Sequence, residues 1–199
     1  MPILIKSTPD SGFSDPIGLL NDCHRRIEHF LSVLVRVSGE ARGGAMTSEM
    51  EDAWTRSLDY FRDAAPRHTQ DEEESLFPRL EGMDNEQAKQ TMQQIAALET
   101  DHENAAQWHD EVDRLGRRWL AEHTLPEQDA AHLHEILLLL DDMYRQHIYV
   151  EEHKVFPTAA AVLPASELKQ MGGEMAKRRG LDFGLTNISQ LVPPPARKP

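Results

Sequence analysis

The sequence predicts an all-α protein: an up-down-up-down four-helix bundle built from a duplicated helical hairpin, followed by a short C-terminal helix and a tail. Apolar residues recur with the 3.6-residue period of helices along four long segments, and no strand-like alternation or glycine-rich phosphate loop competes with that pattern. Histidine and glutamate also recur at matching places about 79 residues apart. A duplicated hairpin that closes on itself brings four helices, each carrying such residues, to a common centre.

The composition is that of one acidic domain. A chain of 199 residues with 39% hydrophobic residues is long enough for a single domain with a sizeable core. Its net charge of −13 argues against nucleic acid and against an anionic membrane surface as partners. Cys23 is the only cysteine, and the apolar run at residues 2–5 is too short for a signal peptide or a membrane span. We therefore expect a cytoplasmic protein without disulfides.

The first predicted hairpin contains two helices separated by glycines. Leucine and isoleucine at helical spacing predict a helix over residues 16–38, which Gly39 and the glycines after it should end. A second helix should begin near Ser48. Pro66 interrupts its apolar stripe, so we expect a bend there, and Pro78 should help to stop it.

The second predicted hairpin repeats this arrangement. Apolar periodicity predicts helices over about 85–122 and 126–160, with a break at Thr124-Leu125-Pro126. A short amphipathic helix at about 166–179 should pack across one end of the bundle before a proline-rich tail. The expected organisation has three regions: an irregular N-terminal arm at 1–15, the bundle at 16–160, and the short helix with its tail at 161–199.

The repeated element is a His-x-x-x-Glu turn followed by Phe-Pro, found at 68–78 and again at 147–157. Residues four apart lie on one face of a helix, so each turn can present a nitrogen and an oxygen donor to one metal centre. A lone histidine precedes the turns by 44 and 45 residues. These positions predict six metal ligands: His24, His68, Glu72, His102, His147 and Glu151.

Four imidazoles and two carboxylates suit iron, manganese or zinc, since imidazole nitrogen is borderline and carboxylate oxygen is hard. Glu72 and Glu151, if each bridges two metals, would offset part of the metal charge in a dry core. We expect two iron ions joined by an oxo or hydroxo bridge, with zinc or manganese as substitutes. About one open position per metal would then remain for a small ligand such as dioxygen, peroxide or nitric oxide. The sequence names no protein partner.

These motifs resemble the hemerythrin-like family, the HHE cation-binding bundles, over about residues 16–160. The resemblance implies the same six ligands. The family's oxygen carriers have a further histidine where this chain has Ala106, and they space the last ligand pair by five residues where His147 and Glu151 are four apart. This departure implies that both metals are open, and it favours redox chemistry or sensing over reversible oxygen carriage. The arrangement is similar to a bacterial subgroup with peroxide-decomposing members and to the iron-sensing domain of a eukaryotic ubiquitin-ligase subunit.

Several residues near the six predicted metal ligands are also candidates for a role at the site. Glu28, one turn from His24, is a candidate seventh ligand or an acceptor for an imidazole N–H. His109 is interpreted as core or as an outer neighbour of the ligands. Tyr144 is interpreted as packing, with a hydroxyl that could bind a dioxygen species. Cys23 is expected to be an inert thiol. Three acidic residues are expected on the solvated face: Glu73, Glu74 and Glu152.

Three functions remain open from the sequence. The first is a non-haem di-iron protein that binds dioxygen or peroxide at a bis-carboxylate-bridged site and turns it over as an oxidoreductase. The second is an iron- or oxygen-sensing or oxygen-binding protein without turnover, in which residues 166–199 report the state of the site. The third is a helical bundle with a degenerate or zinc-filled site and an interaction role.

Overall fold

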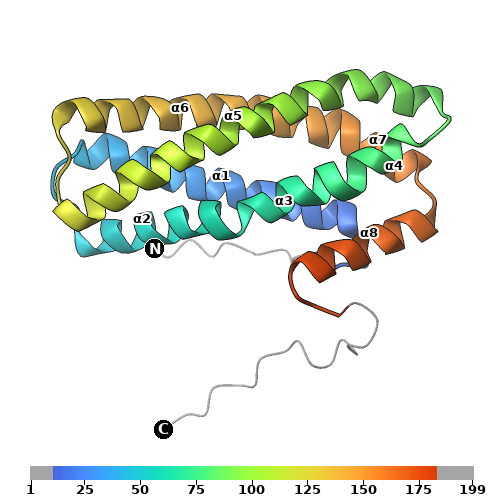
Figure 1. Cartoon of the computed structure of the whole chain (residues 1–199), viewed down its shortest axis with the longest axis horizontal. Coiled ribbons are helices and arrows are strands. Elements are labelled where there is room, and N and C mark those ends of the chain that lie inside the picture. Colours follow the sequence, from blue (N-terminus) through green and yellow to red (C-terminus); the bar gives the residue numbers. More distant parts are fainter. Residues whose placement is uncertain (1–10, 183–199) are drawn as a thin grey trace, which may run out of the picture.

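The computed structural model describes residues 11–182, and within this range the chain forms helices and no strand. Four helical rods lie side by side along the long axis, and a shorter helix, α8, packs beside one end (Figure 1). The all-α bundle prediction is therefore confirmed. The first rod is α1 (Pro16–Ala41), and the second contains α2 (Ser48–Asp63), α3 (Ala65–Asp71), the π-helical turn η1 (Glu72–Leu76) and α4 (Phe77–Glu81). The third is α5 (Glu86–Glu122), and the fourth contains α6 (Glu127–Val150), the π-helical turn η2 (Glu151–Val155) and α7 (Phe156–Val162).

Each rod neighbours two others, which closes the bundle. Helix α1 contacts α2 and α6, and α5 contacts the same two helices from the other side. Asn85 caps α5, because its side-chain oxygen accepts hydrogen bonds from the backbone N–H groups of Gln87 and Ala88. No helix within residues 11–182 combines the length and the apolar content needed to cross a bilayer.

Helix α1 runs further than the sequence predicted. Gly39 lies inside the helix and does not end it. The chain turns at Arg42 and Gly43, whose φ angles of 47° and 79° are both left-handed. A Cβ atom at Gly43 would lie 2.7 Å from the Cβ of Ala130. Glycine is therefore needed here both for its backbone angle and for the close approach of α6.

The second rod is interrupted two residues before Pro66. Helix α2 ends at Asp63 and α3 begins at Ala65, which places Pro66 in the first turn of the new helix. Proline is tolerated there because the N–H it lacks would have no partner within the helix. The interruption expected from Pro66 is thus present, and it lies directly before the turn that carries His68.

The Phe-Pro sequences do not stop their helices, so the prediction for Pro78 is wrong. The rod continues through Pro78 as far as Glu81, and the fourth rod passes Pro157 in the same way. A π-turn precedes each proline, and in the first of them Phe77 donates its backbone N–H to the carbonyl of Glu72, five residues earlier. A proline ring crowds the carbonyl four residues before it, and a widened turn relieves that contact. Each π-turn begins at a predicted glutamate ligand.

Two apolar clusters fill the bundle, and the predicted ligands lie between them. On each rod, the buried apolar residues toward one end of the bundle from the predicted ligands belong to the first cluster. Those toward the other end belong to the second. The first cluster includes Ile27, Ala65, Ala105 and Ile148. The second includes Leu20, Leu76, Leu98 and Val155. The polar layer is thus enclosed from both ends, which keeps bulk water away from it.

Helix α8 (Ala165–Arg178) corresponds to the short helix predicted at 166–179, and it packs against α1, α3 and η1. Asp71, which is fully buried, accepts hydrogen bonds from Arg178 Nη1 at 2.7 Å and Arg179 Nη2 at 2.6 Å. Arg79 of α4 donates to Glu174 of α8 at 2.8 Å. The predicted arm before residue 11 and the proline-rich tail after residue 182 lie outside the described residues.

Candidate metal centre

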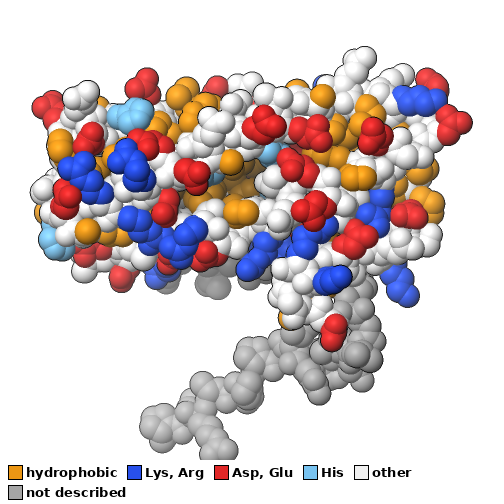
Figure 2. Space-filling model, viewed as in Figure 1, with side chains coloured by type: hydrophobic (Ala, Val, Ile, Leu, Met, Phe, Trp, Pro, Cys, Tyr) orange, Lys and Arg blue, Asp and Glu red, His pale blue; other side chains and the backbone are white. Residues whose placement is uncertain are grey.

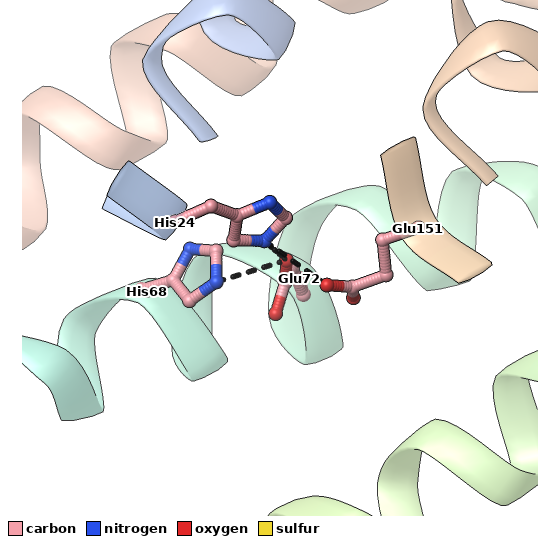
Figure 3. Close-up of side chains that lie close together, drawn as sticks. All are labelled: His24, His68, Glu72 and Glu151. Carbon is pink, nitrogen blue, oxygen red and sulfur yellow. Dashed lines mark ion pairs between the residues drawn. The ribbon is translucent and has the colours of Figure 1, made fainter. Parts of the chain in front are cut away.

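The structure brings all six predicted ligands together in the polar layer between the two apolar clusters. Each of the four rods contributes one histidine, and the second and fourth rods each contribute one glutamate as well. All six residues are buried, with exposed fractions of 9% or less. Figure 3 shows four of them pointing toward one another: His24, His68, Glu72 and Glu151.

The carboxylate of Glu72, on the second rod, contacts histidines of the first, second and third rods. Its Oε1 atom lies 3.3 Å from His68 Nε2 and 3.9 Å from His24 Nε2. Its other oxygen, Oε2, lies 3.4 Å from His102 Nε2. The carboxylate therefore presents one oxygen to each half of the duplicated chain.

Glu151 occupies the equivalent place in the second repeat. Its Oε2 atom lies 3.0 Å from His24 Nε2 and 3.3 Å from His147 Nε2. Like Glu72, it starts a π-turn one helical turn after its histidine. The two glutamates consequently approach the centre of the layer from opposite rods.

The donor atoms form two groups of metal-ligand composition, and in each group the atoms lie within 4.8 Å of one another. Both groups contain Glu72 and Glu151. The remaining members of the first group are His24 and His68, and those of the second are His102 and His147. Two adjacent four-donor sets that share two carboxylates have the composition of a dinuclear centre.

Hydrogen bonds do not account for this convergence. Both oxygens of Glu72, both oxygens of Glu151 and Nε2 of His24 are buried without a hydrogen-bond partner among the described residues. The contacts at 3.0–3.9 Å thus have the distances of ion pairs but not hydrogen-bond geometry. Unpartnered carboxylate oxygens in a dry core are costly. Cations among these atoms would satisfy them, so the residues present fit a pair of metal ions.

The electrostatics of the layer agree with this assignment. Burial, together with the charge of Glu151, raises the pKa of Glu72 well above its usual value. Burial also acts to raise the pKa of Glu151, but the nearby His147 and His24 outweigh it and lower that pKa. Burial acts to lower the pKa of His24, but Glu151 and Glu152 outweigh it and raise the pKa to about 10. When no cation is bound, a proton on Glu72 and a proton on His24 limit the net charge of the layer, and metal ions would displace them.

Three of the imidazoles are held from behind by carboxylates. His24 Nδ1 lies 3.0 Å from Glu152 Oε1, and His102 Nδ1 lies 2.8 Å from Glu73 Oε1. His147 Nδ1 lies 3.3 Å from Asp101 Oδ2. A carboxylate at Nδ1 places the proton there and leaves Nε2 free to bind a metal. Two of the three pairs cross the duplication, since Glu152 of the second repeat holds His24 of the first, and Glu73 of the first holds His102 of the second.

Glu73 lies on the exposed face as expected and Glu152 is partly exposed, but both residues also reach the site. Their side chains are 39% and 33% exposed, but their carboxylates contact ligand imidazoles. Sequence reasoning also missed Asp101. The available signals were the matching repeat positions of Glu73 and Glu152 and the place of Asp101 directly before His102. Glu74 is exposed as expected.

The fourth imidazole breaks the symmetry of the repeat. His68 Nδ1 is buried and has no hydrogen-bond partner among the described residues. The residue that corresponds to Asp101 in the first repeat is Cys23, whose sulfur accepts a hydrogen bond from Arg26 Nη2 at 3.3 Å. Burial raises the pKa of the Cys23 thiol, in agreement with the inert thiol expected there. The two donor groups are therefore chemically inequivalent.

We expect Asp101→Asn to weaken metal binding at the group that contains His147. The amide carries no charge to hold the Nδ1 proton of His147, and loss of such a partner typically lowers metal affinity by about 10–100-fold. Competition with a metal chelator measures this change. Asp142→Asn, an exposed change on the same rod as His147, is the matched control. Equal metal retention by the two variants would contradict the role given to Asp101.

Comparison with known proteins agrees with the geometry. The family model described as the hemerythrin HHE cation binding domain matches residues 15–168, most of the chain. The chain belongs to the hemerythrin HHE family. This hemerythrin domain is also similar to a protein of Haemophilus influenzae (strain ATCC 51907 / DSM 11121 / KW20 / Rd) whose description is "Uncharacterized protein". The two are 29% identical over 167 residues, which cover 84% of this chain and 91% of the relative.

The other candidate residues of this hemerythrin domain lie in different surroundings. Glu28 is exposed and is not part of either donor group, so the structure does not bring it to the site. His109 Nε2 lies 3.0 Å from the Tyr144 hydroxyl. The Tyr144 ring lies 6.3 Å from that of His147, centroid to centroid. Tyr144 thus lies between the ligand layer and His109.

A cavity of about 340 Å³ opens between the second and third rods of the hemerythrin domain. Figure 2 shows it as a hollow near the middle of the viewed face, with hydrophobic side chains inside it. Ala106 forms part of its wall, at the position where the family's oxygen carriers have a further histidine. A second space of about 10 Å³, lined by Tyr144 and the four ligand histidines, adjoins it. The smaller space has about the volume of one water molecule.

The pH dependence of stability tests the burial of His109. Burial lowers the pKa of His109 to about 4, so the folded domain keeps it neutral, whereas the unfolded chain binds a proton below about pH 6.5. The stability linked to this neutral ring is therefore present above pH 6.5 and is lost as the pH falls toward 4. Relative to His109→Phe, the unaltered protein should lose about 3 kcal/mol between pH 7 and pH 4 in urea unfolding. Parallel pH profiles for the two proteins would contradict the expectation.

Proposed function

We propose that the domain binds two iron ions at the six converging residues and uses them to bind dioxygen or peroxide, with redox turnover of the bound ligand. The observation that carries this proposal is the pair of donor groups that share Glu72 and Glu151. Bound iron would supply a redox-active Lewis acid with open positions for a small ligand. The symmetric ligand set, without a further histidine at Ala106, supports a centre in which both ions accept ligands.

The protein's own residues have three tasks in this proposal. His24, His68, His102 and His147 present Nε2 atoms to the ions, and the outer carboxylates fix three of the four rings in the required tautomer. Glu72 and Glu151 supply two negative charges that a pair of cations needs in a dry layer. The apolar clusters on either side exclude bulk water, which strengthens these charge interactions.

Metal analysis and optical spectroscopy of the purified protein test the proposal. We expect two irons per chain and a near-ultraviolet charge-transfer absorption that bleaches on reduction. Addition of peroxide to the iron-loaded protein should give steady peroxide consumption, and zinc-loaded protein should give none. One metal or fewer per chain after loading with excess iron would overturn the proposed centre. A two-iron protein that does not react with peroxide or dioxygen would overturn the proposed chemistry.

A second candidate function is sensing without turnover, and the contact of α8 with η1 favours it. Arg178 of α8 and the following residue, Arg179, pair with Asp71, which directly precedes the predicted ligand Glu72 in the chain. A change in the position of Glu72 would therefore act on the attachment of α8.

Limited trypsin digestion tests the sensing candidate. Cleavage after Lys177 to Arg179 should be at least tenfold slower in metal-loaded than in metal-free protein, since metal binding would hold η1 and α8 together. Cleavage after Arg114, on the exposed face of α5, should change less. Equal protection of α8 in both states would rule out this candidate.

A further inference from the structure

The donor group that contains His102 and His147 has a carboxylate behind each of its imidazoles. His102 Nδ1 lies 2.8 Å from Glu73 Oε1, and His147 Nδ1 lies 3.3 Å from Asp101 Oδ2. A carboxylate at Nδ1 keeps the ring proton on that nitrogen, fixes the plane of the ring and makes Nε2 a better donor to a metal. Both imidazoles of this group are therefore oriented before an ion binds.

The donor group that contains His24 and His68 has such a carboxylate on one side only. His24 Nδ1 lies 3.0 Å from Glu152 Oε1. His68 Nδ1 is buried and has no hydrogen-bond partner among residues 11–182. When His68 gives Nε2 to a metal, its proton must lie on Nδ1, where it is a buried donor without an acceptor. Such a donor is costly, so an ion binds less favourably at this group.

No other feature of the donor set separates the two groups. Glu72 and Glu151 belong to both, and each group adds two histidines. All four histidines are buried, so exposure to solvent does not distinguish them either. Any difference in metal affinity therefore comes from the residues behind the imidazoles.

Position 23 is where the first repeat departs from the second. Asp101 directly precedes a ligand histidine of its own rod and holds His147 of the next rod, and Cys23 has the same place in the first repeat. The backbone carbonyl of Cys23 accepts a hydrogen bond from the Tyr60 hydroxyl at 3.4 Å, so position 23 lies beside the second rod, which carries His68. A thiol is a weak acceptor, and this one already accepts from an arginine. It does not replace the aspartate.

We infer that the domain binds its two metal ions unequally: the His102/His147 group fills first, and the His24/His68 group binds its ion about 10–100-fold more weakly. Cys23 sets this difference, because an aspartate at its position would hold His68 as Asp101 holds His147. The ion of the His24/His68 group is thus the one that exchanges when the metal supply changes. The inference rests on the two-metal centre of the proposed function, but not on the identity of the metal or on its redox chemistry.

Nitrogen NMR of the imidazoles shows which group fills first when Zn²⁺ is added to metal-free, full-length protein. With one Zn²⁺ ion per chain, we expect the ring signals of His102 and His147 to move to metal-bound positions and those of His68 to stay where they were. Repulsion between two dications weakens whichever ion binds second, so the order of filling is decisive and unequal steps alone are not. Equal filling of the two groups, or filling of the His68 group first, would overturn the inference.

Exchanging residues between the repeats tests the role of position 23. In competition with a chelator, Cys23→Asp should bind the second Zn²⁺ ion about 10–100-fold more tightly than the unaltered protein does. Cys23→Ala, the matched control, removes the thiol without adding a carboxylate and should leave both binding steps unchanged. Unchanged binding of the second ion by a folded Cys23→Asp protein would contradict the role given to Cys23.

The reverse exchange, Asp101→Cys, gives His147 the same surroundings as His68. It should weaken binding of the first Zn²⁺ ion by about 10–100-fold and spread a single ion over both groups. The Asp101 side chain is 35% exposed, whereas Cys23 is buried, so this variant tests the inference even if an aspartate at position 23 prevents folding. Binding of a single ion at the His102/His147 group alone, as in the unaltered protein, would overturn the inference.

The outcomes separate this inference from the proposed function. Protein that binds two Zn²⁺ ions but fills both groups equally would overturn this inference alone. Protein that fills the groups in the expected order, but does not react with peroxide or dioxygen when loaded with iron, would overturn the proposed chemistry alone. Protein that holds no more than one Zn²⁺ ion in excess metal would overturn the two-metal centre on which both depend.

Discussion

Glu72→Gln is expected to reduce metal content from the two ions proposed above to well below one per chain. Glu72 belongs to both donor groups, so its loss affects both metal positions at once. His68 belongs to only one group, and His68→Asn should leave the other position filled. An amide oxygen has the shape of the carboxylate without its charge, and two dications in a dry core depend on that charge. Metal analysis after loading and gel filtration measures the difference.

Unfolding experiments separate this loss of metal from damage to the fold. In the metal-free protein Glu72 is a buried carboxyl whose pKa is raised by burial and by Glu151. Replacing it by a neutral amide should therefore leave the metal-free stability unchanged or raise it by about 1–3 kcal/mol. Glu99→Gln, the same chemical change at an exposed position of α5, should alter neither metal content nor stability. A Glu72→Gln protein that still holds two ions would refute the shared-carboxylate centre.

Asp71→Asn is expected to lower the free energy of unfolding by about 3–5 kcal/mol, because it leaves two arginines without their buried counter-charge. Asp71 is fully buried, and the side chains of Arg178 and Arg179 are 15% and 19% exposed. An amide accepts one hydrogen bond less well than a carboxylate and brings an N–H group toward a guanidinium. Urea unfolding of the metal-free protein gives the change directly.

Glu74→Gln is the matched control for this pair. Glu74 contacts Arg178 at 3.2 Å, but its side chain is 58% exposed, so loss of its charge should cost less than about 1 kcal/mol. The Asp71 variant should also release α8, which limited proteolysis after Lys177 would reveal. If the two variants lost similar free energies of unfolding, the burial of Asp71 would not strengthen the attachment of α8.

The bundle could be predicted because its determinants are local. Helical periodicity and turn residues located the four rods, and Asn85 and Pro126 marked starts that the structure reproduces within a residue. The errors concern where helices end. Gly39 did not end α1, since the helix continues to Ala41. Pro78 did not stop the second rod, because a π-turn absorbed the clash between its ring and the preceding turn. The spacing of residues in the sequence does not reveal whether a helix ends at a glycine or proline or continues past it.

The six converging residues could also be predicted, because duplication preserves both the spacing and the face of each ligand turn. Their outer partners could not. Glu152 and Glu73 are rotated away from the ligand face of their own rods, and they reach His24 and His102 because neighbouring rods pack at those heights. The match between Asp71 and the arginines of α8 depends in the same way on packing between distant segments.

The sequence by itself determined the helical class, the duplication and the six histidine and glutamate side chains that converge at the candidate metal centre. These follow from the 3.6-residue period, which assigns each residue to a face of its own helix. Only the tertiary structure decided which carboxylate stands behind which imidazole, that His68 has none among residues 11–182, and that a cavity opens beside Tyr144 and His109. The physical reason is that such contacts depend on the relative height and rotation of different rods. The packing of many side chains together sets the relative height and rotation of the rods. Neither can be read from the periodicity of the sequence.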